Sequence, residues 1–175
     1  DTTTATGTVF YEELLSGFTA KDNLMILSHY GVATTNSDPS YRLNSDSGSN
    51  YARRGSSNGG TDFTVTSGTD WRLGGGNANQ YSFDVGFCSN IATKEKLIIH
   101  NGVNGKASGA GTAPDRMELI NKWANTSNQI TTVNMMHVQS GGSYNFTADS
   151  EVVVLGCDDD EADTGTNFWQ ELANN

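Results

Sequence analysis

One apolar run near the end of the chain constrains the fold more than any other segment. Val152, Val153, Val154 and Leu155 follow one another without a polar residue, between a polar turn and an acidic stretch that follows Gly156. A continuous apolar run of this length is typical of a β-strand that is covered on both faces. It therefore predicts a strand in the middle of a β-sandwich or barrel, in a scaffold or binding protein rather than an enzyme.

The composition supports an all-β domain. Only 35% of the residues are hydrophobic, 20 are Gly and two are Pro. Aromatic and β-branched residues form short runs between Gly, Ser, Asn and Asp, as in a domain with many turns. Disorder is the alternative for so polar a chain, but only 17% of the residues are charged and apolar runs recur, which favours a folded domain.

Strand patterns recur along the whole chain. Residues 81–88 alternate bulky apolar with small or polar side chains, as a half-buried strand does. Other strands are expected at residues 9–15 (or a helical turn), 23–30, 41–43, 50–54, 62–66, 70–73, 96–103, 116–123, 129–138 and 152–155. The strands at 41–43 and 50–54 are expected to pair around a turn at residues 44–49.

This spacing predicts a jelly-roll-like antiparallel β-sandwich. A single domain over residues 1–175 is expected, with a core over about residues 9–160, an extended N-terminal segment and a short acidic and aromatic tail over residues 161–175. In the tail, Phe168, Trp169 and Leu172 are expected on a short amphipathic helix. These side chains need burial, either by the domain itself or by a neighbouring subunit.

The charge excludes some partners. Ten Lys and Arg against 20 Asp and Glu give a net charge of −10, which repels nucleic acid and anionic membranes. No apolar stretch approaches the roughly 18 residues of a membrane-spanning helix. Nucleic-acid binding and a membrane span are therefore not expected.

No catalytic pattern stands out. His29, His100 and His137 each lie in an expected strand, and no nucleophile-elbow, zinc-protease, phosphate-loop or dinucleotide motif is present. Cys88 and Cys157 lack metal-ligand spacing, and two separate thiols are favoured over a disulfide. A small glycan-active enzyme with a carboxylate pair stays an alternative, because acidic residues are plentiful.

Two kinds of ligand are weighed against structural roles. Asp158, Asp160 and Asp163 offer oxygen atoms to Ca²⁺, but a solvated acidic loop is favoured over a metal site. Residues 44–50 also carry suitable oxygens, and a turn held by Asp and Asn side chains, with Gly supplying positive φ, is favoured there.

Trp71 and Tyr81 are the candidates for stacking on a glycan, although a core position is favoured for each aromatic residue taken singly. Asn125 and Asn145 begin N-glycosylation sequons, whose use depends on the host.

Several segments together resemble a known family. The run Arg42-Leu-Asn-Ser-Asp-Ser-Gly-Ser-Asn-Tyr-Ala-Arg-Arg54 and the run Lys122-Trp-Ala-Asn-Thr-Ser127 are the most specific of them. Weaker matches lie at residues 11–14, 23–27, 89–97, 113–118, 150–156 and 167–172. The chain resembles the jelly-roll virion structural proteins of tailed phages and archaeal viruses, which are capsid decoration or tail-fibre components. Leu43 and Cys157 depart from the family pattern, where aromatic residues are usual, without placing the fold in doubt.

The resemblance implies a role without assigning a catalytic residue. It implies a non-enzymatic structural protein on the virion exterior that self-associates, by analogy as a trimer, and docks on other virion proteins. One alternative is a tail-fibre module that binds a host-surface glycan. Another is a subunit of an extracellular filament or surface layer, in which the N-terminal segment adds a strand to the next subunit.

Overall fold

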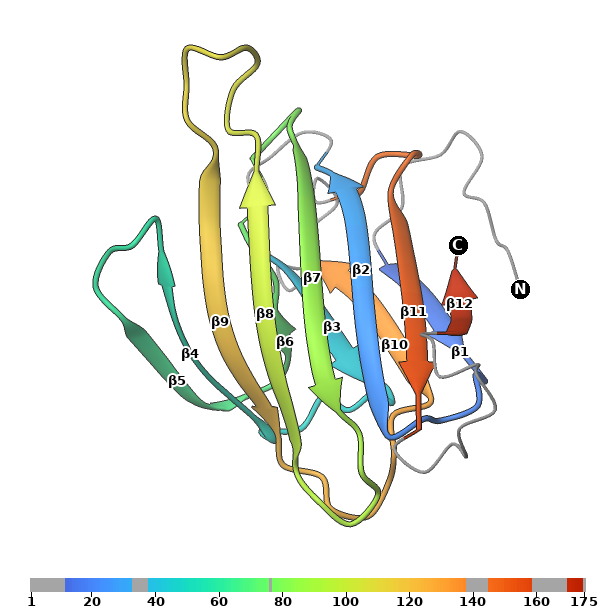
Figure 1. Ribbon diagram of the computed structural model, residues 1–175. Coiled ribbons are helices and arrows are strands. Elements are labelled where there is room, and N and C mark those ends of the chain that lie inside the picture. Colours follow the sequence, from blue (N-terminus) through green and yellow to red (C-terminus); the bar gives the residue numbers. More distant parts are fainter. Residues whose placement is uncertain (1–11, 33–37, 76, 138–144, 159–169, 175) are drawn as a thin grey trace.

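A computed structural model describes residues 12–32, 38–75, 77–137, 145–158 and 170–174, which form twelve β-strands and no helix (Figure 1). The strands are β1 (Glu12–Ser16), β2 (Asn23–Gly31), β3 (Pro39–Leu43), β4 (Tyr51–Ser57), β5 (Phe63–Gly68), β6 (Trp71–Arg72), β7 (Tyr81–Ser89), β8 (Lys96–Asn104), β9 (Asp115–Trp123), β10 (Thr132–His137), β11 (Glu151–Cys157) and β12 (Gln170–Asn174).

The strands form two sheets that face each other (Figure 1). The large sheet has the order β12-β11-β2-β7-β8-β9-β4-β5, and the small sheet has the order β1-β10-β3-β6. Every neighbouring pair is antiparallel. The expected all-β antiparallel sandwich is therefore confirmed, and residues 116–123 lie in a strand as expected.

The core lies between the sheets and is rich in aromatic rings. Trp71 is fully buried and meets Tyr41 edge to face, with ring centroids 5.0 Å apart. Two glycines on neighbouring strands give this core its space: a Cβ on Gly86 would overlap the Trp71 indole, and a Cβ on Gly102 would overlap the Asp84 carboxylate. Strand glycines of this kind commonly mark a close approach.

The strands β3 and β4 do not pair with each other, contrary to the expected hairpin. Strand β3 pairs with β10 in the small sheet, whereas β4 pairs with β9 in the large one, so residues 44–50 carry the chain from one sheet to the other. The Asp46 carboxylate accepts hydrogen bonds from the Gly48 amide at 2.8 Å and from Trp123 Nε1 at 2.7 Å. The turn is thus held by an Asp side chain as predicted, but Asn44 and Ser45, not Gly48, have positive φ.

The prediction of a helix in the tail is wrong for residues 170–172. Gln170–Asn174 form strand β12, which pairs with β11 through a register that contains a bulge. A helix of five or six residues is marginal in water, whereas the open edge of β11 offers a ready ladder of backbone hydrogen bonds. Phe168 and Trp169 lie outside the described residues, as does the side chain of Leu172.

Candidate functional site: the outer face of the large sheet

The hairpin β7–β8 carries its bulky apolar side chains on the outside of the sandwich. On β7 the buried residues are Ser82, Asp84, Gly86 and Cys88, and on β8 they include Lys96, His100 and Asn104. The exposed large apolar residues on this face are Tyr81 (49%), Phe83 (48%), Phe87 (43%), Leu97 (58%), Ile99 (56%), Val103 (40%) and Ile120 (57%). The alternation was correctly predicted, but the apolar set points away from the core.

Apolar side chains that face outward lie next to one another across five strands of the large sheet. In the register of the sheet, Leu155 (β11), Met25 (β2), Phe87 (β7), Ile99 (β8) and Ile120 (β9) are successive partners. We call this set the apolar row. Because cross-strand neighbours on one face lie only about 5 Å apart, the five side chains form one continuous apolar band on the outer face of the large sheet.

The same face explains the apolar run of β11. Its burial alternates, with Val152 and Val154 buried in the core and Val153 and Leu155 half-buried on the outer face. Among the described residues, the inner face of this strand is buried and the outer face is half-buried, so the expectation that both faces are covered is met only in part. The run is continuous because β11 contributes Val153 and Leu155 to the apolar part of the outer face, which it shares with β2, β7 and β8.

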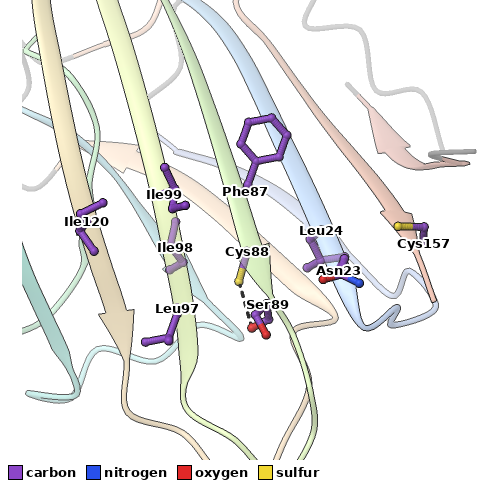
Figure 2. Close-up of a pocket in the computed structure, with 10 residues that line it drawn as sticks. All are labelled: Asn23, Leu24, Phe87, Cys88, Ser89, Leu97, Ile98, Ile99, Ile120 and Cys157. Atoms are coloured by element: carbon purple, nitrogen blue, oxygen red, sulfur yellow. Dashed lines mark hydrogen bonds between the residues drawn. The ribbon is translucent and has the colours of Figure 1, made fainter. Parts of the chain in front are cut away.

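A shallow groove overlaps this band at Phe87, Ile99 and Ile120 (Figure 2). Its volume is about 770 Å³, and residues of β11, β2, β7, β8 and β9 line it. Phe87, Leu97 and Ile99 form its middle, with Ile120 at one side and Cys157 at the other (Figure 2). A smaller hollow of about 280 Å³ adjoins it at Ile99 and Ile120 and reaches Arg54 on β4.

The inner face of the hairpin is polar and tightly bonded. Asp84 Oδ1 lies 2.7 Å from His100 Nε2 and accepts a hydrogen bond from the Gly74 amide at 3.1 Å. The Tyr30 hydroxyl donates to the Gly74 carbonyl, and burial, together with the nearby Asp84 carboxylate, raises the pKa of Tyr30. Both His100 and Asp84 are sealed in the core, with side chains 0% and 1% exposed.

The ammonium group of Lys96 is buried next to the loop that joins β7 and β8. Lys96 is 0% exposed, and its Nζ donates to the carbonyls of Ile91 at 3.0 Å, Lys94 at 2.7 Å and Asn125 at 3.0 Å. Burial lowers the pKa of Lys96. These bonds tie the β7–β8 loop to the segment after β9.

The two candidate glycan-stacking residues lie in different places. Trp71 is 0% exposed in the core, which is the position favoured for it from the sequence, and its ring is not available to stack on a glycan. Tyr81 lies on the outer face and stacks on His29, with ring centroids 5.2 Å apart. Of the two candidates, Tyr81 is therefore the one with an exposed ring.

The acidic candidates for Ca²⁺ are only partly described. Asp158 accepts hydrogen bonds from Lys21 Nζ at 2.7 Å and from the Asp22 amide at 3.0 Å, and the first of these bonds lowers its pKa. Asp160 and Asp163 lie outside the described residues. In the part of the chain that the structure describes, no three His, Cys, Asp or Glu side chains gather as metal ligands would. Cys88 and Cys157 are separate thiols, as predicted.

Comparisons with protein-family models, with curated proteins and with solved structures found no match to this chain. No helix among the described residues is long and apolar enough to cross a membrane.

Fold and site together define an antiparallel β-sandwich with one apolar outer sheet face. Sequence reasoning missed that face, although its signal was present: Gly86 and Asp84 alternate with Phe83, Val85 and Phe87, and glycine and aspartate fill a core poorly.

Proposed function

We propose that this protein is a non-enzymatic structural protein that assembles through the outer face of the large sheet. The apolar row carries the proposal, because it forms a continuous apolar band across five strands, in which Phe87, Ile99 and Ile120 are exposed and the other two side chains are half-buried. Soluble monomers rarely leave a contiguous apolar patch of more than a few hundred Å² in water. The resemblance to virion exterior proteins gives this assembly its setting, a capsid decoration or tail component that docks on other virion proteins.

The strand order supports the jelly-roll form of the sandwich. With the hairpin β7–β8 set aside, the large sheet from β2 onwards reads β2-β9-β4-β5 and the small sheet reads β1-β10-β3-β6. Eight strands exchanged between two sheets in this order correspond to the two nested Greek keys of a jelly roll. In this reading β7–β8 is a hairpin inserted into the large sheet, and it carries the centre of the outer face.

The buried position of the Asp84–His100 pair favours a structural role over an enzymatic one. An acid and a histidine 2.7 Å apart are a familiar catalytic combination. Here they are closed off from solvent on every side, beneath a sheet whose outer surface is apolar. We infer that they fix the core of the hairpin and do not meet a substrate.

Binding of a host glycan is the second candidate function, and Tyr81 supports it. Its ring is half exposed, and the Asp149 carboxylate beside it raises the pKa of the Tyr81 hydroxyl. An exposed ring beside a carboxylate suits a sugar. It is a smaller feature than the apolar row, which carbohydrate hydroxyl groups would not cover well.

The test places a charge in the middle of the apolar row. Ile99→Asp should leave the thermal unfolding midpoint within a few degrees of wild type, because the side chain is 56% exposed. It should also lower the mass of the wild-type oligomer in light scattering. Leu14→Asp is the matched control, since Leu14 is 50% exposed but belongs to β1 of the small sheet. An unchanged oligomer in Ile99→Asp, or a wild-type protein that is monomeric at every concentration, would contradict the proposal.

A further inference from the structure

We propose that a second copy of the chain covers the outer face, and that the two large sheets stack about a two-fold axis parallel to their strands. The inference rests on the proposed assembly function and specifies its partner and geometry. It is drawn from the charges at the two ends of the face and from the position of β7 between them.

One row on the outer face ends in opposite charges. It runs from Glu151 (β11) through His29, Phe83 and Val103 to Arg116 (β9). We call it the charged row. Glu151 and Arg116 are both exposed. On the β9 side the outer face also carries Glu118 and Lys122, and Lys122 Nζ lies 3.1 Å from the Glu95 carboxylate. Arg116 Nη1 lies 3.8 Å from Glu118, a long contact that leaves most of its five N–H donors available.

Strand β7 is the middle strand of the five that carry both rows. A two-fold axis that runs along β7, in the plane between two facing sheets, places β11 of one copy over β9 of the other. Each row of one copy then lies over the same row of the second copy, with its residues in the opposite order. In the charged row, Glu151 of each copy then faces Arg116 of the second copy, and this attraction occurs twice in the pair.

The apolar row is compatible with the same axis. Its reversal places Phe87 opposite Phe87, Met25 opposite Ile99, and Leu155 opposite Ile120, so each contact in the row is apolar. Two sheets packed face to face keep their strands within about 30° of each other, at a separation of about 10 Å. The arrangement would continue the layered packing of the sandwich into a four-layer body.

A two-fold axis perpendicular to the strands is less favourable. It would place β9 over β9 and β11 over β11, so that no Arg116 would face a Glu151 of the second copy. Arg116 and Lys122 lie 3.8 Å and 3.1 Å from Glu118 and Glu95 of their own chain, so repulsion between the two copies of β9 does not decide the geometry. The two Glu151–Arg116 contacts therefore favour the parallel axis.

The area is sufficient for a specific pair. Five strands about 4.8 Å apart and seven residues at about 3.4 Å each span a face of roughly 24 by 24 Å. Covering this face on both copies removes on the order of 1,200 Å² from water, which reaches the range of specific interfaces.

The experiment uses charge reversal in the full chain and mixes the variants. In Glu151→Arg every Arg116 meets an arginine, and in Arg116→Glu every Glu151 meets a glutamate, so each variant alone should associate about tenfold or more weakly than wild type. In an equimolar mixture of the two variants, the mixed pair has one copy with two arginines and one with two glutamates. Both contacts are then attractive, and sedimentation velocity should show association restored to within about threefold of wild type.

The outcomes separate the geometry from the function. Lys94→Glu makes the same charge change as Arg116→Glu, but on the exposed β7–β8 loop, and it should weaken association much less than Arg116→Glu does. If Ile99→Asp abolishes assembly but the mixed variants associate no better than each alone, the two-fold geometry is wrong while the assembly function stands. If neither Ile99→Asp nor the charge variants alter assembly, both are wrong. A wild-type monomer whose melting temperature falls in Ile99→Asp would show that the chain covers its own outer face, which also overturns the inference.

Discussion

Gly102 shows how a single missing side chain shapes the inner surface of the large sheet. A Cβ at this position would collide with the Asp84 carboxylate, which already binds His100 and the Gly74 amide. We expect Gly102→Ala to lower the free energy of unfolding by about 1–3 kcal/mol, as overpacking of a dense core does. Urea unfolding followed by tryptophan fluorescence measures this change.

Gly111→Ala is the control for that substitution. Nothing lies within 4 Å of a Cβ built on Gly111, and its φ is not in the left-handed region. Its unfolding midpoint should match wild type. Equal loss in both variants would mean that glycine content, and not the contact with Asp84, sets the cost.

Protonation of His137 should make the fold sensitive to mild acid. This ring is 0% exposed and stacks on Phe146 with centroids 4.0 Å apart, and burial lowers its pKa to about 4. The unfolded chain, with a histidine pKa of about 6.5, binds the proton more readily. Stability from this residue is therefore complete above about pH 6.5 and is lost as the pH falls toward 4, by up to about 1.4 kcal/mol per pH unit.

The measurement compares wild type with His137→Gln between pH 4 and 7. The free energy of unfolding should fall with decreasing pH in wild type and should fall less steeply in the variant. The difference between the two curves isolates His137 from the other titrating groups. Parallel curves would refute this account.

Lys96 is the residue whose substitution should cost most at the end of the hairpin. Lys96→Met keeps the aliphatic stem but leaves the carbonyls of Ile91, Lys94 and Asn125 without their ammonium donor. We expect a loss of about 1–3 kcal/mol, because these part-buried carbonyls lose hydrogen bonds from a charged donor. Chemical denaturation measures it, and Lys94→Met at an exposed site should cost less than about 0.5 kcal/mol.

At the scale of elements, strand existence was predictable and strand orientation was not. Period-2 alternation placed β7 within one residue of its observed bounds, because the pleat repeats every two residues in any sheet. The alternation is symmetric between the two faces, however, so only tertiary contacts decide which set lies inside. Here Trp71 occupies the space beside Gly86, and Asp84 the space beside Gly102, which requires the small and polar set to face inward.

Pairing between distant strands was also beyond the sequence. Strands β3 and β4 flank a turn that Asp46 holds in the predicted manner, yet they belong to opposite sheets. Local hydrogen bonds fix the turn, whereas the packing of Trp123 and Tyr51, with ring centroids 6.4 Å apart, lies with β4 and β9 in the large sheet. A local pattern carries no information about such long-range partners.

Strand β12 should protect the edge of the large sheet. It pairs with β11 from Val153 to Gly156, so ending the chain before Gln170 would leave the apolar strand β11 at an open edge. We expect faster hydrogen exchange at β11 amides and a greater tendency to aggregate, because unpaired edges recruit other chains. Hydrogen-exchange mass spectrometry tests this, with β9, which is paired on both sides, as the internal reference. Unchanged exchange at β11 would argue against a protective role.

At the scale of the whole molecule, charge and apolar surface act in opposite directions on assembly. Each copy carries a net charge of −10, which repels other copies over about 10 Å at 0.1 M salt and over much less at 1 M. The apolar row is not screened. We expect association to tighten between 0.05 and 0.5 M NaCl, measured by sedimentation equilibrium. Weaker association at the higher salt would mean that charged contacts dominate the interface.

The candidate site itself emerged only from the assembled sheet. Met25, Phe87, Ile99, Ile120 and Leu155 lie far apart in the sequence and become neighbours through four separate strand pairings. The apolar run of β11 indicated that both of its faces would be covered, and the chain covers one of them with its own core. On the proposed assembly, a second copy covers the other.

The position of the hairpin β7–β8 determines how the large sheet of such a sandwich could gain or lose strands. It lies between β2 and β9 and contributes two strands, so β2 and β9 would still run in opposite directions without it. A single inserted strand would reverse that relation and break the connection to the small sheet. Proteins built on this plan should therefore widen or narrow their outer face in steps of two strands, about 10 Å at a time. Gain or loss of a hairpin would change the width of this face and leave the sandwich beneath it intact.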